Sequence, residues 1–179
     1  MKPLKQKKCK WCKSLFTPKN TMQKTCSVHC AYAYAKGQRE KSEAKENRKR
    51  KKELNKNDKS WMRARAQTAF NAYIRKRDEK EPCISCGRFH QGQYHAGHYR
   101  TRGTNPELAF NELNCHKQCS ACNNHLSGNL VNYRRNLVDK IGQDKLEWLE
   151  GPHEPKKYTL GEYEEIYQTY KKKLKDLVK

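Results

Sequence analysis

The sequence is poor in the apolar residues that build a large core. Residues of the types Ala, Val, Ile, Leu, Met, Phe, Trp, Tyr and Cys make up 34% of its 179 positions, and charged residues make up 33%. One large hydrophobic core is therefore excluded. Small folded units of this composition usually need disulfides or bound metals for stability.

Long apolar runs are also missing. The N-terminus reads Met1-Lys2-Pro3-Leu4-Lys5, so we expect no secretory signal peptide. No apolar run approaches the roughly 20 residues that span a bilayer. We therefore expect a protein without membrane contact that works in the reducing cytoplasm, the host cytoplasm if a phage encodes it.

Acidic residues are scarce: 19 Asp and Glu stand against 40 Lys and Arg, which gives a formal net charge of +21. An enzyme for neutral substrates has no need of such a charge. A polyanionic partner fits it, because binding would release counterions from the polyanion. The pattern predicts a nucleic-acid-binding protein, and the alternative is a basic protein with a disordered tail.

Cysteine, by contrast, is abundant in this sequence. Eight of the nine cysteines form close pairs, three spaced C-x2-C and one C-x3-C. Cysteines this close rarely bridge each other without strain, but both thiolates can reach one tetrahedral metal. We therefore predict two structural zinc sites rather than a secreted disulfide framework. Their ligands would be Cys9, Cys12, Cys26 and Cys30 in the first set, and Cys83, Cys86, Cys119 and Cys122 in the second.

Four stretches of the chain differ in composition. Residues 1–34 hold the first cysteine set and predict an N-terminal zinc knuckle. Residues 35–59 are dense in Lys, Arg and Glu, so they form either a solvated helix or a flexible basic linker. Residues 60–151 hold the second set and form the predicted main domain. Residues 152–179 predict a C-terminal helix that packs on or beside it.

Helical periodicity appears in three places. It predicts a helix over 60–78 that ends before Pro82, and a second from Leu130 that ends at Gly142. A third begins at Thr159, which forms a capping box with Glu162. The predicted buried face of this last helix is Tyr163, Ile166, Tyr167, Tyr170, Leu174 and Leu177.

The segment enclosed by the second cysteine set holds the residues suited to chemistry. It contains His95 and His98, then Asn114, and Asn123 follows the last cysteine directly. The unperturbed pKa of histidine suits proton abstraction near neutral pH. Asparagine oxygens and imidazole nitrogens can hold a divalent cation that keeps open, water-filled positions. A zinc clamp that only shaped a DNA-binding finger would need neither group.

At these residues the chain resembles a known family. C-x2-C, a Gly-His pair and C-x2-C-Asn resemble the HNH (His-Me finger) nucleases, and the arrangement is similar to endonuclease VII-type Holliday-junction resolvases. The chain resembles most closely the NinG (Rap) recombination proteins of lambdoid phages. The shared features are the N-terminal four-cysteine knuckle, the charged linker, the Trp61 helix, Pro82-Cys83-Ile84-Ser85-Cys86-Gly87, Ala96-Gly97-His98-Tyr99-Arg100, His116-Lys117-Gln118-Cys119 and Cys122-Asn123 with Ser127-Gly128-Asn129.

The resemblance implies an α+β fold, in which a small zinc-stapled ββα-metal (HNH) nuclease domain is flanked by helices. It implies that His98 is the general base, that Asn114 braces the loop between the strands, and that Asn123 ligates a catalytic Mg²⁺ or Mn²⁺. The two zinc ions would be structural.

One position departs from the pattern. HNH enzymes usually carry a metal-binding Asp or His directly before the base, where this chain has Gly97. In the NinG pattern an acidic residue commonly lies three positions before the base, where this chain has His95. We predict His95 as the second cation ligand, with a preference for manganese. The alternatives are a phosphate-contacting surface role for His95 and a purely structural role for His98.

Several other residues have weaker claims. Cys115 and His116 could substitute as zinc ligands, although we expect Cys115 to be a small buried thiol. His29 could replace Cys26 or Cys30. The candidates for phosphate contacts around the site are Arg100, Arg102, Lys117, Arg134 and Arg135.

The predicted function is a metal-dependent, structure-selective endonuclease for branched DNA such as Holliday junctions and D-loops. Branch selectivity comes from the resemblance alone. We expect a homodimer, because junction resolution needs paired cuts, and phage or host recombination proteins as partners. The alternative is a non-catalytic zinc-finger protein that binds DNA as a recombination accessory.

Overall fold

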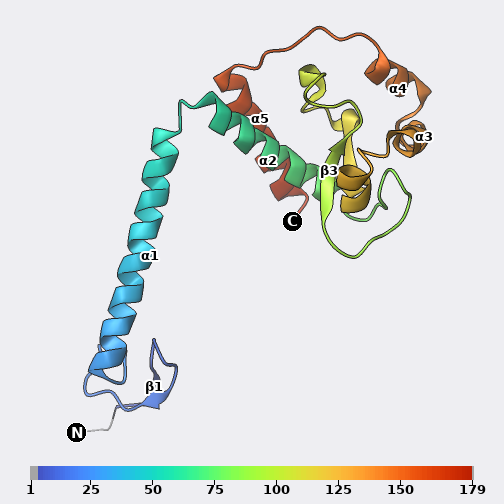
Figure 1. Ribbon diagram of the computed structural model, residues 1–179. Coiled ribbons are helices and arrows are strands. Elements are labelled where there is room, and N and C mark those ends of the chain that lie inside the picture. Colours follow the sequence, from blue (N-terminus) through green and yellow to red (C-terminus); the bar gives the residue numbers. More distant parts are fainter. Residues whose placement is uncertain (1–3, 179) are drawn as a thin grey trace. The chain divides into compact units, whose positions relative to one another are not determined.

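The computed structural model describes residues 4–178, and these combine helices with small two-stranded sheets (Figure 1). The predicted α+β class is confirmed. The chain forms two compact units, Met1–Asn55 and Lys56–Lys179. The boundary falls inside the charged stretch 35–59, so most of that stretch belongs to the first unit.

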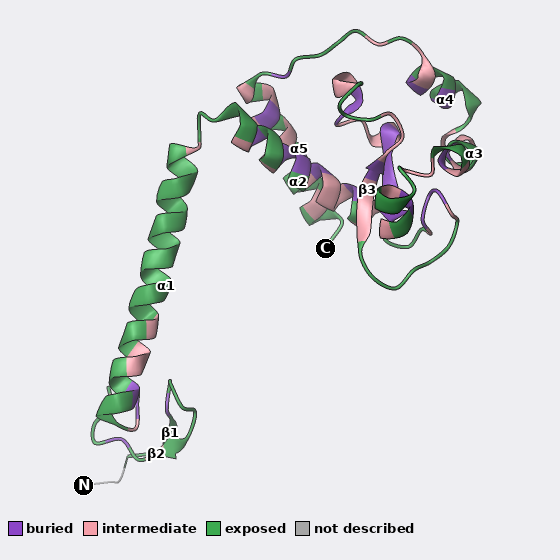
Figure 2. Ribbon diagram, in the orientation of Figure 1, coloured by how far each residue is buried: buried purple, intermediate pink, exposed green. Residues whose placement is uncertain are grey.

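The first unit is a short hairpin followed by one long helix. Strand β1 (Lys7–Lys8) pairs antiparallel with β2 (Leu15–Phe16), and helix α1 (Val28–Leu54) follows. Ser27 caps α1 by accepting a hydrogen bond from the backbone N–H of Cys30. Cys30 is the one buried residue of the helix, and Figure 2 shows the rest of α1 largely exposed. The sequence allows two alternatives for residues 35–59, a solvated helix and a flexible linker. The structure shows the solvated helix up to Leu54.

In the second unit, helix α2 (Lys59–Arg77) packs along helix α5 (Leu160–Asp176). Asp58 caps α2 through the backbone N–H groups of Ser60 and Trp61, and three basic residues in the last turn complement the helix dipole. The predicted helix over 60–78 is confirmed. Its buried face includes Met62 and Phe70, which are 2% and 0% exposed.

Helix α5 starts with the predicted capping box, in which Thr159 and Glu162 hydrogen-bond each other's backbone N–H. Tyr163 and Tyr170 are buried, as expected. Leu177, which we expected to be buried, is 45% exposed, because the helix ends at Asp176 and leaves it beyond the packed face.

A two-stranded hairpin lies between the helices of this unit. Strands β3 (Tyr94–His98) and β4 (Cys115–Cys119) are antiparallel, with Tyr94 opposite Cys119 and His98 opposite Cys115. On one face, Ala96 and Cys115 pack with Phe70 of α2. The loop between the strands holds two 3-10 turns, η1 (Pro106–Leu108) and η2 (Glu112–Asn114).

After β4 come a π-helical turn η3 (Ala121–His125) and the helices α3 (Leu130–Ile141) and α4 (Gln143–Glu150). Gly142 ends α3 as predicted, and its φ of +86° favours glycine. Helix α4 was not predicted. It is only eight residues long, and its Leu146 and Leu149 are too few to give a helical pattern.

Three apolar clusters stabilise the second unit. One joins α3 and α4 around Tyr133, one joins α2 and α5 around Met62, and one joins α2 to the hairpin around Phe70. Among residues 4–178, no helix has the length and apolar character needed to cross a membrane.

Candidate functional site

Two groups of four cysteines have the geometry of metal sites. In each group the Sγ atoms all lie within 4.8 Å of one another, and Cys26 Sγ is 3.6 Å from the Sγ atoms of both Cys12 and Cys30. A tetrahedral zinc ion with Zn–S bonds of about 2.3 Å holds its sulfurs roughly 3.8 Å apart. Each group can therefore hold a zinc ion. Both groups consist of the predicted cysteines, Cys9, Cys12, Cys26 and Cys30 in one, and Cys83, Cys86, Cys119 and Cys122 in the other.

The first group joins the hairpin of the first unit to the start of α1. The turn after Cys9 closes through hydrogen bonds from Cys9 N to Ser14 O and from Lys13 N to Cys9 O, with Lys13 at a φ of +65°. Cys30 lies in the first turn of α1, where Ser27 receives its N–H. A local turn and a helix start thus place two pairs of thiols together.

The second group joins a tight turn to the end of the β3–β4 hairpin. The turn holds Cys83 and Cys86, and Gly87 closes it at a φ of +66° by donating its N–H to Cys83 O. Cys119 ends β4, and its N–H points at Cys83 Sγ, 3.3 Å away. Asn129 donates its amide to Cys122 Sγ. Such N–H donors stabilise thiolates that bind a metal.

His98 ends β3, with its ring between the hairpin and α2. Its Nε2 lies 2.9 Å from the carbonyl oxygen of Ala109, and its ring centroid lies 6.0 Å from that of Phe70. A carbonyl only accepts, so Nε2 carries the hydrogen and Nδ1 is the basic nitrogen. Burial is the main cause that lowers the pKa of His98, to about 4, and Arg102 adds to it. The imidazole is therefore neutral at pH 7.

Cys115 faces the basic nitrogen of His98. Its Sγ lies 3.7 Å from His98 Nδ1, and the residue is 0% exposed. Burial raises the pKa of this thiol well above its usual value, so it stays protonated. The expected buried thiol is therefore present, and it is the nearest described hydrogen-bond partner of the nitrogen that a base would use.

Asn114 is fully buried and ties together the loop between the strands. Its Oδ1 accepts the N–H of Arg100, and its Nδ2 donates to the carbonyl oxygens of Arg100 and Leu108. Its own carbonyl accepts the N–H of Tyr99. These bonds fix the backbone directly after His98. The ring of His98 is held separately, by Ala109.

His95 lies near the polar residues that follow Cys122. Its Nε2 is 3.4 Å from Nδ2 of Asn124, which also donates to Ser120 Oγ. Asn123 donates its amide N–H to Asn124 Oδ1 at 2.7 Å, which leaves Asn123 Oδ1 without a partner in the described chain. Asn124 therefore links the two predicted cation ligands. The sequence indicated it only through its place after Asn123.

His95 and His98 lie on opposite faces of the hairpin. Side chains alternate along a strand, and three positions at roughly 3.3 Å each put their Cα atoms about 10 Å apart. Among residues 4–178, no hydrogen bond or ring contact joins His98 to Asn123. The structure thus brings His95 close to Asn123 and Asn124, while His98 packs against α2.

The unusual glycine before His98 has a steric reason. A Cβ on Gly97 would lie 2.1 Å from Oε1 of Gln118, whose amide is held by Ser85 and Gly128. The carbonyl of Gly97 also accepts the hydroxyl of Tyr133. Any side chain at this position would displace a buried one, so the position cannot supply a metal ligand.

The five residues predicted to contact phosphate differ in exposure and in whether another group already binds them. Lys117 is 5% exposed, donates to the carbonyl of Glu79 and lies over the ring of Tyr94, so it is a poor candidate for phosphate. Arg134 is paired with Glu150 at 2.8 Å. Arg100 hydrogen-bonds Asn105. Arg102 and Arg135 are exposed and lack ion pairs within residues 4–178.

His116 and His29 lie outside the two cysteine groups. His116 is buried against Tyr133, with its Nδ1 3.3 Å from the hydroxyl oxygen. Burial, the largest cause, lowers its pKa to about 3. Its role is therefore packing, and the expectation that it could replace a zinc ligand finds no support in the geometry.

The fold and these groups define a small basic α+β protein with two four-cysteine metal-site candidates. The sequence model described as "Bacteriophage Lambda NinG protein" matches residues 1–179. The chain belongs to the NinG family.

Individual relatives agree with this assignment. Protein ninG of Escherichia phage 933W is 41% identical over 189 residues, which cover 96% of this chain and 94% of that protein. Protein ninG of Escherichia phage lambda is 50% identical over 117 residues, 65% of this chain and 57% of that protein. Protein ninG of Salmonella phage P22 is 48% identical over 117 residues, which again cover 65% of this chain and 57% of that protein. The chain thus matches a little over half the length of the last two. No solved structure matches the chain.

Proposed function

We propose that the protein is a metal-dependent endonuclease of the HNH type that cuts branched DNA, such as Holliday junctions and D-loops. The observation that carries the proposal is the state of His98. Its imidazole is neutral at pH 7, its hydrogen is fixed on Nε2 by Ala109, and exposed Arg102 lies near enough to affect its pKa. A neutral imidazole with a fixed tautomer can accept a proton on Nδ1, and its low pKa makes it a weaker base than an unperturbed histidine.

The second element is a candidate cation site on the other face of the hairpin. The atoms that would bind the cation are Asn123 Oδ1 and His95 Nε2. Asn124 could add a third ligand if its amide were rotated by 180° so that its oxygen faced the ion. The set of one imidazole and amide oxygens fits Mn²⁺ better than Mg²⁺. A bound ion would stabilise negative charge on a phosphate at this face of the hairpin, and His98 lies on the other face.

The second cysteine group connects these elements. Its zinc ion would fix the turn at Cys83, the end of β4 and the start of η3, which sets where Asn123 and His95 lie. Selectivity for branches would depend on contacts with the DNA backbone, for which a chain of formal charge +21 is suited. A homodimer would supply the two active sites that paired cuts need.

A second candidate function has its own support. The ring of His98 is buried, and its basic nitrogen faces the thiol of Cys115 rather than open solvent. This packing is typical of a structural histidine. It favours a zinc-containing DNA-binding protein that assists recombination without cutting DNA.

One experiment separates the two functions. The full zinc-loaded chain is incubated with a four-way junction and with a linear duplex of equal length, either without added divalent cation or in Mg²⁺ or Mn²⁺. The nuclease predicts cation-dependent cuts near the branch, faster with Mn²⁺ and slower on the duplex. A gel shift of intact junction under every condition would support the DNA-binding protein. Equal cutting of both substrates would retain the nuclease and remove its branch selectivity.

A further inference from the structure

A cationic groove runs along α2 in the second unit. Its first part is a cavity of about 490 Å³, and its second, of about 430 Å³, shares Arg63, Gln67 and Arg102 with the first. We call the two together the α2 groove. The first part is lined by Lys59, Arg63, Gln67, Arg102, Gly103, Pro106, Ala109, Phe110, Lys156, Lys157, Tyr158 and Tyr163, and the second adds Ser60, Ala64, Thr68 and Asn71.

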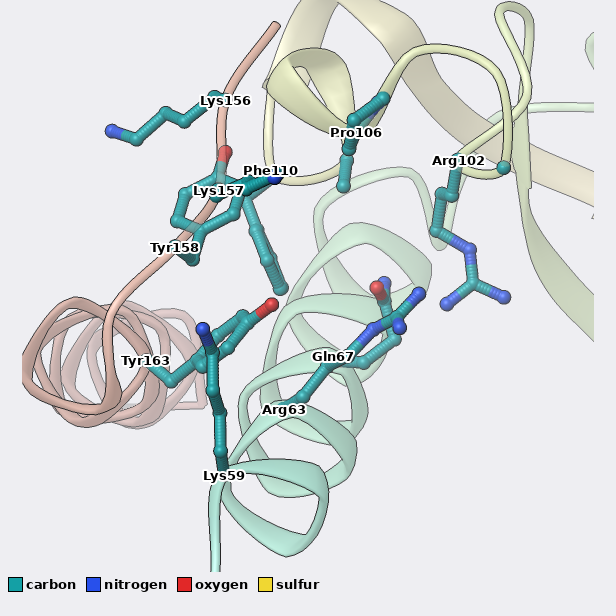
Figure 3. A pocket seen from close by; sticks show the side chains of 12 residues that line it. Lys59, Arg63, Gln67, Arg102, Pro106, Phe110, Lys156, Lys157, Tyr158 and Tyr163 are labelled. Carbon is teal, nitrogen blue, oxygen red and sulfur yellow. The ribbon is translucent and has the colours of Figure 1, made fainter.

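The charge of this groove is one-sided. Five lining residues are Lys or Arg and none is Asp or Glu. Lys156 pairs with Glu162 at 3.0 Å, whereas Arg63 and Arg102 have neither an ion pair nor a hydrogen bond within residues 4–178. Figure 3 shows both of these arginines pointing toward the same part of the cavity. Like charges gathered without a counter-charge favour an anionic ligand.

The polar groups beside these arginines are held in place. Gln67 is 9% exposed, and its amide nitrogen is bound to Asn71, which leaves its oxygen fixed. Tyr163 is 7% exposed, stacks on Tyr158 at 5.4 Å, and points its hydroxyl into the cavity (Figure 3). The rings pack against each other with little free face, so they form a wall rather than a platform for stacking a base.

The shape selects the kind of anion. Two connected cavities along one helix suit a chain-like polyanion better than a single phosphate. Ser60, Thr68 and Asn71 continue the line with uncharged hydrogen-bonding groups, which often contact the DNA backbone. The groove also adjoins the candidate site, because Ala109 both lines it and receives the N–H of His98.

We infer that the α2 groove binds the phosphodiester backbone of a DNA strand, with Arg63 and Arg102 as its main phosphate contacts and the Tyr163 hydroxyl as a further donor. The inference rests on DNA as the partner in the proposed function. It adds a surface of which the sequence indicated only Arg102, since Arg63 and Lys59 are two of many basic residues. In this arrangement the bound strand passes the edge of His98.

The test measures binding without cleavage, with the zinc-loaded chain in buffer free of added Mg²⁺ and Mn²⁺. Fluorescence anisotropy with a labelled four-way junction gives the Kd of the full chain over a range of salt concentrations. The double variant Arg63→Gln/Arg102→Gln is expected to bind at least about tenfold more weakly near 0.1 M salt, and its plot of log K against log salt is expected to be shallower by about two. Lys145→Gln/Lys172→Gln is the matched control, because both lysines are exposed and lie outside the groove.

Two results would overturn the inference. One is an affinity and salt slope of the Arg63→Gln/Arg102→Gln variant equal to those of wild type or of the lysine control, with melting temperatures unchanged. The other is competition for the junction by micromolar dTMP or inorganic phosphate, which would indicate a site for a small phosphate. Because this assay does not depend on cleavage, a loss of binding in the Arg63→Gln/Arg102→Gln variant supports the groove even if wild type fails to cut DNA in Mn²⁺.

Discussion

The two cysteine groups have the same number of ligands but different surroundings. In the first unit, Cys9, Pro18 and Cys30 are the buried apolar residues among the described positions, and Cys12 is exposed. In the second unit, Cys83, Cys119 and Cys122 form one buried cluster, and three further apolar clusters pack the rest of the unit. A metal would therefore supply nearly the whole core of the first unit, whereas in the second it would fix the hairpin and η3 beside a core that exists without it.

Removing one ligand from each group should show this difference most strongly. Cys9→Ser is expected to lose one zinc equivalent and unfold the first unit, because structural zinc contributes on the order of 10 kcal/mol to folding of such small units. Cys119→Ser is expected to lose the other equivalent while α2 and α5 stay folded. Zinc analysis and hydrogen exchange measure both.

The comparison would fail if Cys9→Ser left residues 7–30 as protected from exchange as in wild type. It would also fail if Cys119→Ser unfolded the α2–α5 pair. Cys115→Ser is a control outside both groups and should keep two zinc ions.

Phe70→Ala tests the apolar half of the comparison. Phe70 is 0% exposed and contacts Phe110 and Tyr170 edge-on. Its loss is expected to destabilise the second unit by roughly 3–5 kcal/mol, without change in hydrogen exchange of the first. Phe89→Ala, at a residue 70% exposed, is the control for thermal unfolding. Equal effects of the two variants would contradict the assigned core.

Gly97→Ala tests the close packing of β3 against the side chain of Gln118 in β4. The new methyl group would meet the anchored side chain of Gln118, so we expect about 1–3 kcal/mol of destabilisation. Gly103→Ala is the control, because nothing lies within 4 Å of its added Cβ. Adding Gln118→Ala should relieve the clash. No rescue by this second change would contradict the steric account.

The buried histidines should make the second unit sensitive to mild acid. Burial lowers the pKa of His98 to about 4 and of His116 to about 3. Between pH 7 and 5.5 the unfolded chain gains protons that the folded one does not, so stability should fall by about 1 kcal/mol for each histidine. Denaturant unfolding at fixed zinc content measures this change.

His116→Gln should remove about half of this pH dependence, and His125→Gln, at an exposed position, should leave it unchanged. A wild-type stability that stays constant over this pH range would show that the two histidines are not buried in neutral form.

Local patterns predicted much of this fold from the sequence. The capping box at Thr159, the glycine end of α3 and both cysteine groups depend on residues close in sequence or on spacing with one physical meaning. We did not predict helix α4 from the sequence, because its two buried leucines are too few to show a helical period. We did not predict the division into two units either. The Lys- and Glu-rich stretch has no apolar face, so its sequence does not indicate which unit it belongs to.

The candidate site was less predictable. Strand alternation, which puts His95 and His98 on opposite faces, follows only once the hairpin register is known. The carbonyl of Ala109 meets His98 through the fold of the loop, and Cys115 faces it as its register partner in β4. No motif marks either contact. Nothing in the sequence indicated that Lys117 is buried, so we expected it to contact phosphate. Its burial depends on the carbonyl of Glu79 and the ring of Tyr94, which only the fold brings to it.

Single-turnover cleavage of a four-way junction by His98→Ala in Mn²⁺ tests the central claim most directly, with zinc content and junction affinity measured on the same sample. A general base contributes roughly 10²- to 10⁴-fold to a rate. We therefore predict a loss of that size with two zinc ions and near-normal binding retained, and no loss in His125→Ala. Cleavage at the wild-type rate by zinc-loaded His98→Ala would contradict the account.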